Sequence, residues 1–169
     1  MILIVTLNPL LERRFHFSKI NLGSINRTNL NSLAVGGKGL NVSRQLKKLG
    51  LKSFNFFFSG GNNGKLYREI LKTSQMDFTY VQTKAETRHA AVILSEEEKQ
   101  VTSFFSENPE ISQNEVEEFK TKLDKMIQNC EVVVFSGSSP CKTADSIIPY
   151  GINLANKYDK ISICDTYGS

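Results

Sequence analysis

Residues 35–44 read Val-Gly-Gly-Lys-Gly-Leu-Asn-Val-Ser-Arg, and this stretch has the residue types of a ligand-binding turn. Gly36, Gly37 and Gly39 allow the backbone to bend sharply and a ligand to approach it closely. Apolar residues then recur at helical spacing, so we expect a helix over about 41–49. Backbone N–H groups at the start of a helix bind anions or hydroxyl groups, and Lys38 and Asn41 would add side-chain contacts. A tight structural turn before an ordinary helix explains the spacing alone equally well.

The glycine-rich stretch does not fit the common phosphate-binding motifs. A Walker A loop ends in Gly-Lys-Ser/Thr, whereas Lys38 is followed by Gly39. A dinucleotide fingerprint begins directly after the first strand, which we expect to end near residue 7. The three cysteines are far apart and form no CxxC pair, and the two histidines do not join them at a metal-ligand spacing. The sequence therefore predicts neither a disulfide framework nor a bound metal.

The composition is that of one globular domain in a chain of 169 residues. The net charge of +4 is mild, and lysine and arginine are interleaved with acidic residues, so no nucleic-acid partner is expected. The apolar run at the N-terminus is too short for a signal sequence, and no segment is long enough to span a membrane. We therefore expect a cytoplasmic protein without a membrane partner.

Two kinds of strand alternate with helices along the chain. Continuous apolar runs predict buried strands at 2–7, 54–58, 78–81, 132–135 and 161–164, and helical spacing predicts the intervening helices, including one after a capping box at 112–115. We expect a flexible loop at 59–64, and a kink or early break at Pro149 in a helix over 143–156. This pattern predicts an α/β fold with a mostly parallel sheet. The alternating segments 13–17, 25–35 and 88–105 predict a separate small sheet over the glycine-rich stretch.

Polar residues follow several of the buried strands. Asn8, Ser59, Ser136 and Asp165 stand where these strands are expected to end. Ligands of parallel α/β sheets bind at the carboxyl ends of the strands, so we expect these loops to meet there with the glycine-rich stretch.

Several short motifs occur in a characteristic order. They are Thr6-Leu7-Asn8-Pro9, Gly23-Ser24-Ile25-Asn26-Arg27, Gly36-Gly37-Lys38-Gly39-Leu40-Asn41-Val42-Ser43, Gly60-Gly61-Asn62-Asn63-Gly64, Glu86-Thr87-Arg88, Ser136-Gly137-Ser138-Ser139-Pro140 and Asp165-Thr166. Together they resemble the N-terminal half of the PfkB, or ribokinase-like, carbohydrate kinases. The resemblance covers essentially all of the chain and is strongest to the branch with 1-phosphofructokinase and tagatose-6-phosphate kinase.

The resemblance implies a kinase that transfers the ATP γ-phosphate to a hydroxyl group of a phosphorylated ketohexose with the help of Mg²⁺. In this family the glycine turn and its asparagine hold sugar hydroxyls, which here implies Gly36, Gly37 and Asn41, with Lys38 beside them. The small sheet would be the lid of the family, which often also forms a homodimer interface. Closure of such a lid excludes water from the reaction.

Three further residues complete the implied acceptor site. Arg88 would bind the phosphate that the sugar already carries, because a guanidinium suits bidentate phosphate contacts. Ser138 would add a phosphate or hydroxyl contact. Glu12 stands where family members usually have a hydroxyl-binding aspartate, and Ala90 replaces a usual asparagine. These two departures leave the identity of the sugar open.

The family's Gly-Ala-Gly-Asp element, which carries the catalytic base, has no counterpart in the sequence. The resemblance places this element and the nucleotide site in a C-terminal half, so we expect a truncated, ribokinase-like chain that is inactive alone. The alternatives are a non-catalytic sugar-phosphate-binding module or degenerate kinase, and a nucleoside kinase. Arg88 disfavours the last, because a nucleoside brings no phosphate.

Overall fold

The structure of the chain is a computed structural model that describes residues 1–166. In chain order its elements are β1 (Ile2–Thr6), β2 (Leu10–Phe17), β3 (Asn31–Gly36), α1 (Lys38–Lys48), β4 (Ser53–Gly60), α2 (Gly61–Thr73), β5 (Asp77–Thr83), β6 (His89–Ser95), β7 (Gln100–Phe105), α3 (Gln113–Gln128), β8 (Val132–Ser136), the 3₁₀ turn η1 (Lys142–Ala144), α4 (Ile147–Lys157) and β9 (Ile161–Asp165).

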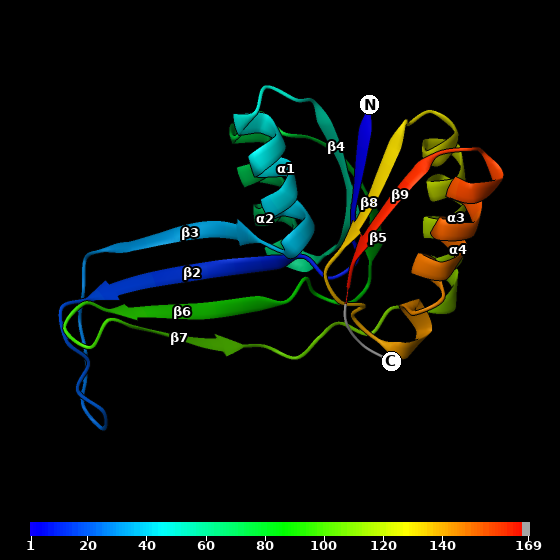
Figure 1. The fold of residues 1–169 in the computed structure, drawn as a ribbon. Helices are drawn as coiled ribbons and strands as arrows, with labels where there is room; N and C mark the ends of the chain where they lie inside the picture. Colours follow the sequence, from blue (N-terminus) through cyan, green and yellow to red (C-terminus); the bar gives the residue numbers. More distant parts are fainter. Residues whose placement is uncertain (167–169) are drawn as a thin grey trace.

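The main sheet is fully parallel, with the strand order β5-β4-β1-β8-β9. Helices α1 and α2 cover one face and α3 and α4 cover the other (Figure 1). Because both faces are covered, the central strands are mainly apolar, as the sequence predicts, although β4 also buries Asn55. Phe56 of β4 stacks on Phe119 of α3 with ring centroids 3.9 Å apart, and both side chains are fully buried. This contact fixes α3 against the middle of the sheet.

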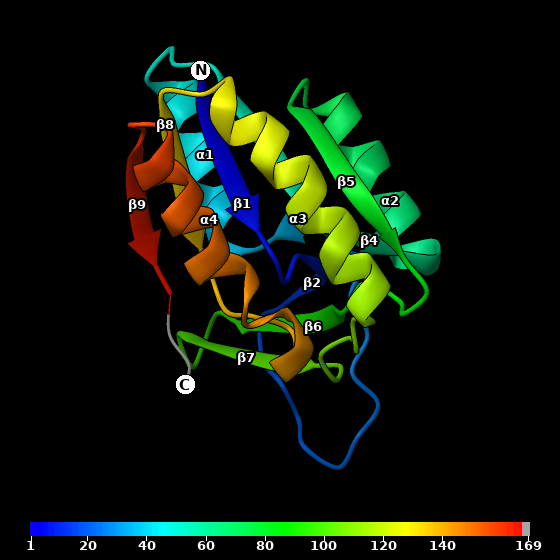
Figure 2. The same ribbon diagram turned by 90° about the vertical axis from the view of Figure 1, so that its right-hand side faces the viewer.

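The small sheet has the order β3-β2-β6-β7, with β2 and β6 parallel and the two outer pairs antiparallel. It leaves the main body at the carboxyl end of β1, because β2 follows β1 after a connection of residues 7–9. Figure 2 shows β6 and β7 passing beneath the ends of the main-sheet strands. The predicted α/β architecture with a separate small sheet is thus confirmed.

One predicted loop and one predicted helix start are wrong. Residues 61–64 form the first turn of α2 and not a flexible loop. The glycines serve close packing, since a Cβ atom at Gly64 would lie 2.6 Å from Oγ of Ser59 and 2.9 Å from Oγ1 of Thr87. Helix α1 begins at Lys38, three residues earlier than expected, because Gly37 takes the N-cap position with φ +115°.

The helix predicted over 143–156 is divided. Residues 142–144 form η1, and α4 begins at Ile147, so Pro149 lies in the first turn of α4 and produces no kink inside it. A proline is tolerated there because the first backbone N–H groups of a helix have no intrahelical acceptor. Of the segment 25–35, only the part from Asn31 onward is a strand. Among residues 1–166, no helix combines the length and apolar character needed to cross a bilayer.

Candidate acceptor-sugar site

The glycine turn joins the end of β3 to the start of α1. Gly37 has no side chain to cap the helix, and the first turn of α1 contains no acidic residue. The partial positive charge of the helix N-terminus is therefore not offset by an acidic side chain of its own first turn. Lys38 is exposed and Asn41 is exposed one turn later. This end of α1 suits a ligand with hydroxyl or anionic oxygens.

Glu12 of β2 lies directly over Gly36. A Cβ atom at Gly36 would overlap Oε1 of Glu12 and lie 3.0 Å from its Cδ, so glycine leaves room for the carboxylate in this position. The other carboxylate oxygen, Oε2, accepts hydrogen bonds from Nε and Nη2 of Arg14 at 2.9 and 2.6 Å. The side chain of Glu12 is only 16% exposed. The structure thus brings the predicted residues Glu12 and Gly36 into contact and holds the carboxylate in place.

Two residues outside the predicted set support the glycine turn from behind. The hydroxyl group of Tyr67, on α2, donates to the carbonyl oxygen of Gly36 at 3.2 Å. Burial raises the pKa of Tyr67, so the hydroxyl keeps the proton that it donates. Arg44 donates to the carbonyl oxygen of Val35 and, at 2.9 Å, to Oδ1 of Asn41. Arg44 could have been found from the sequence, because it is the last residue of the glycine-rich motif. Nothing in the sequence pairs Tyr67 with the turn.

The loop after β8 lies against the same helix start. A Cβ atom at Gly39 would overlap Oγ1 of Thr6 and lie 3.4 Å from the carbonyl oxygen of Ser136. Gly137 has φ +104°, and its backbone N–H donates to the carbonyl oxygen of Asp165 at 2.9 Å. The ends of β1, β8 and β9 therefore meet beside α1, as expected for a parallel sheet.

A polar cluster, formed by Asn8, Arg88, Asn108 and Ser138, lies at the end of β1. Nη2 of Arg88 donates to the carbonyl oxygen of Asn8 at 3.1 Å, and Nη1 donates to Oδ1 of Asn108 at 3.1 Å. Nδ2 of Asn8 donates to Oδ1 of Asn108 at 3.0 Å and lies 3.5 Å from Oγ of Ser138. The predicted residues Arg88 and Ser138 are thus joined through Asn8 and Asn108. The sequence places Asn8 at the end of β1, but it gives no reason to single out Asn108.

The start of α2 fixes the segment that carries Arg88. Gly60 and Thr87 exchange two hydrogen bonds, from N–H of Gly60 to Oγ1 of Thr87 and from N–H of Thr87 to the carbonyl oxygen of Gly60, each at 3.0 Å. Nδ2 of Asn63 donates to the carbonyl oxygen of Thr87 at 3.0 Å. The backbone N–H of Leu11 donates to the carbonyl oxygen of Arg88 at 3.0 Å. Arg88 therefore stands next in space to the strand that carries Glu12.

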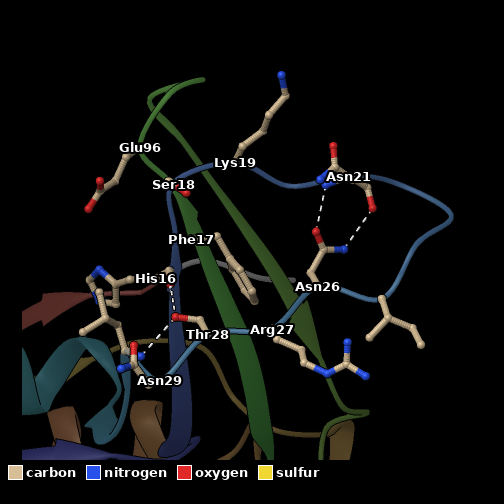
Figure 3. Close-up of a pocket in the computed structure, with 12 residues that line it drawn as sticks. His16, Phe17, Ser18, Lys19, Asn21, Asn26, Arg27, Thr28, Asn29 and Glu96 are labelled. Atoms are coloured by element: carbon tan, nitrogen blue, oxygen red, sulfur yellow. Dashed lines mark hydrogen bonds between the residues drawn. The ribbon is translucent and has the colours of Figure 1, made fainter.

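A hollow of about 530 Å³ lies elsewhere, at the far end of the small sheet (Figure 3). It opens between the end of β2 and the loop of residues 18–30. Asn26 closes this loop by accepting from the backbone N–H of Asn21 and donating to its carbonyl oxygen, both at 2.9 Å. Thr28 donates to the carbonyl oxygen of His16 at 2.6 Å. The hollow contains none of the seven predicted site residues.

Residues 1–166 contain no group of three or more His, Cys, Asp or Glu side chains that could hold a metal ion.

The chain is similar to several kinases and kinase structures. Tagatose-6-phosphate kinase of Staphylococcus epidermidis is 34% identical over 168 residues, which are 99% of this chain and 54% of that enzyme. A possible 1-phosphofructokinase from Thermotoga maritima superimposes with a TM-score of 0.90 at 29% identity, over 98% of this chain and 53% of that one. Phosphofructokinase-2 from Escherichia coli, solved with fructose-6-phosphate, superimposes with a TM-score of 0.86 at 23% identity, over 99% and 55%.

The chain thus spans about half the length of the curated relatives that it matches. The superpositions confirm the predicted ribokinase-like fold. The sequence pattern of the pfkB family carbohydrate kinases matches residues 13–168, which is most of the chain. The protein therefore belongs to the pfkB family of carbohydrate kinases.

Proposed function

We propose that this chain is the sugar-binding half of an ATP-dependent kinase for a ketohexose phosphate, with fructose 1-phosphate or tagatose 6-phosphate as the acceptor. One observation carries the proposal: Arg88, Ser138 and the glycine turn gather at the carboxyl ends of β1 and β8. A cationic fork and a hydroxyl group suit a phosphate, and a helix start beside a fixed carboxylate suits sugar hydroxyls.

In this proposal each residue has one task. The guanidinium of Arg88 binds the phosphate that the sugar already carries, and Ser138 adds a hydrogen bond to it. The carboxylate of Glu12, the amide of Asn41 and the backbone at Gly36 and Gly37 bind sugar hydroxyls. These contacts fix the orientation of the acceptor hydroxyl, and positioning of this kind is a large part of phosphoryl-transfer catalysis. The phosphoryl donor is ATP, and Lys38, at the start of α1, lies beside the residues that bind the sugar hydroxyls.

Calorimetry with the purified chain tests the acceptor. We expect binding of fructose 1-phosphate or tagatose 6-phosphate, and weaker binding of unphosphorylated fructose. Arg88→Met should remove this preference, whereas Lys142→Met, an exposed cation on η1, should leave it unchanged. Equal affinity of the parent chain for fructose and fructose 1-phosphate would contradict the proposed role of Arg88.

We also propose that the 169-residue chain binds the sugar without transferring a phosphoryl group. Its predicted residues belong to the acceptor side, and the family's Gly-Ala-Gly-Asp element, which carries the catalytic base, has no counterpart in the sequence. If the chain were a non-catalytic sugar-phosphate-binding module, it would bind its ligand at this same site. Magnesium-dependent consumption of ATP by the purified chain with fructose 1-phosphate would overturn this second proposal.

A second copy of the chain is the partner proposed for the small sheet. Val101 and Phe105 of β7 share one face with Val92 and Leu94 of β6, as the strand register shows. The side chains of Val101 and Phe105 are 64% and 57% exposed, and Glu12 is on the same face in β2. A second sheet packed there would cover the site as well as the apolar residues. Sedimentation of the parent chain as a dimer, and of Val101→Glu as a monomer, would support this arrangement, whereas a monomeric parent chain would exclude it.

A further inference from the structure

Asn108 joins three segments that are far apart in the sequence. It lies between β7 and α3, and its Oδ1 accepts from Nη1 of Arg88 at 3.1 Å and from Nδ2 of Asn8 at 3.0 Å. Asn8 lies in the connection that follows β1, and Arg88 precedes β6. One amide oxygen thus ties the arginine to the end of the central strand.

The chain is anchored both before and after Asn108. On one side, the backbone N–H of Ser106 donates to the carbonyl oxygen of His89 at 2.9 Å, and Oγ of Ser106 accepts from the N–H of His89 at 3.0 Å. On the other side, Ile111 is 2% exposed, and its N–H donates to Sγ of Cys141 at 3.3 Å. Pro109 follows directly and restricts the backbone of Asn108 to extended conformations. The segment therefore presents the Asn108 side chain at one place.

The two contacts of Arg88 hold its guanidinium at both terminal nitrogens. Nη2 donates to the carbonyl oxygen of Asn8, and Nη1 donates to Asn108. Hydrogen bonds at both terminal nitrogens fix the plane of the guanidinium fork. Asn8 itself is 3% exposed, so this one of the two supports is buried.

Both acceptors in this arrangement are neutral. A carboxylate in place of either would form an ion pair with Arg88 and offset the charge that an anion requires. An amide oxygen and a backbone carbonyl orient the guanidinium without adding a negative charge of their own. An arginine that is ordered before the ligand arrives loses less side-chain freedom on binding.

We propose that Asn108 is a positioning residue that orients the guanidinium of Arg88 toward the phosphate of the acceptor sugar. The proposal rests on the phosphate-binding role of Arg88 proposed above. It predicts that Asn108 affects the affinity for phosphorylated sugars and not the affinity for sugar hydroxyls.

Calorimetry on the purified chain, with fructose 1-phosphate and fructose as probes, separates these effects. Asn108→Ala removes one contact of Arg88, and we expect about a tenfold loss of affinity for fructose 1-phosphate and none for fructose. Asn108→Asp keeps an acceptor for both hydrogen bonds but adds a negative charge, so its loss should exceed that of Asn108→Ala. A purely structural role predicts instead that Asn108→Asp binds like the parent chain. Asn114→Ala, an exposed asparagine in the first turn of α3, is the matched control.

A measurement without ligand tests the orientation directly. ¹⁵N relaxation of the Nε–H group of Arg88 should show an ordered side chain in the parent protein and a mobile one in Asn108→Ala. Unchanged mobility of Arg88 in Asn108→Ala overturns the role of Asn108. Unchanged affinity in both Asn108 variants does the same if Arg88→Met loses the phosphate preference. Either result leaves the proposed function intact. If Arg88→Met has no effect on the phosphate preference, the proposed function fails, and with it the purpose assigned to Asn108.

Discussion

The hydroxyl group of Tyr67 lies 3.2 Å from the carbonyl oxygen of Gly36 and donates a hydrogen bond to it. A residue of α2 thereby fixes the backbone of a turn that precedes α1. Tyr67 is 1% exposed, and its ring packs edge-on against Phe57 of β4, with centroids 5.1 Å apart. The turn is therefore rigid because the core holds it.

Tyr67→Phe tests this support. The change keeps the ring but leaves the buried Gly36 carbonyl without its donor, so we expect the free energy of unfolding to fall by about 1–3 kcal/mol. The affinity for fructose 1-phosphate should fall as well, because the turn loosens. Urea denaturation and calorimetry measure the two effects. Tyr150→Phe on α4 is the control, and an equal loss in both variants would argue against a specific role of the Tyr67 hydroxyl.

Gly36→Ala should impair binding more than folding. The new methyl group meets mainly the far end of the Glu12 side chain, which can move away. We therefore expect a loss of stability below the ~1–3 kcal/mol typical of rigid overpacking, together with at least about a tenfold loss of affinity for the sugar phosphate. Glu12→Asp shortens the side chain and should restore part of the affinity in the Gly36→Ala background. Strictly additive effects of the two changes would contradict the contact between them.

Gly151→Ala in α4 should impair folding more than binding. Alanine has the higher helix propensity by about 1 kcal/mol, which alone predicts stabilisation. At this position, however, the Cβ atom would overlap the ring of Phe135, a fully buried residue of β8, and lie 3.1 Å from Cδ2 of Leu123. We expect a net destabilisation of roughly 1–2 kcal/mol, because overpacking against a rigid ring outweighs the propensity gain. Asn153→Ala, an exposed change in the same helix, should be neutral or stabilising. A stabilised Gly151→Ala protein would show that the α4–β8 packing is wrong.

Glu115 gives α3 a pH-dependent contribution to stability. Its carboxylate accepts hydrogen bonds from the backbone N–H and the hydroxyl group of Ser112 and from the backbone N–H of Lys84, each at 2.7 Å. Burial raises the pKa of Glu115, but the hydrogen bonds from Ser112 and Lys84 together lower it more, so this pKa lies below its usual range.

The sign of the pH effect follows from this lowered pKa. The stabilisation is complete above the pKa of an unfolded glutamate, about 4.3, and disappears as the pH falls through the lower pKa of the folded protein. Glu115→Gln should cost about 1 kcal/mol at neutral pH, with a difference from the parent that shrinks in acid. Urea denaturation at roughly pH 7 and pH 3 measures it. Glu110→Gln, an exposed residue before the helix, is the control, and a pH-independent loss in Glu115→Gln would refute the assignment.

The sequence alone determined the fold class. Apolar runs marked the buried parallel strands, because a strand covered on both faces has no polar side. The capping box at Ser112 and Glu115 was predicted, and it is present. The ordered motifs led to the pfkB family, to which the chain belongs. Local patterns sufficed here because each signal lies within one element.

Only the tertiary structure decided how the site residues are held. Asn108 and Tyr67 contact residues 100 and 31 positions away, Asn8 and Gly36, and no local pattern encodes such pairings. The same limit explains the error at residues 61–64, where glycine signals close packing against Ser59 and Thr87 and not flexibility. A glycine in a sequence allows both a mobile loop and a tight contact. The neighbours that the fold brings to it determine which of the two is formed.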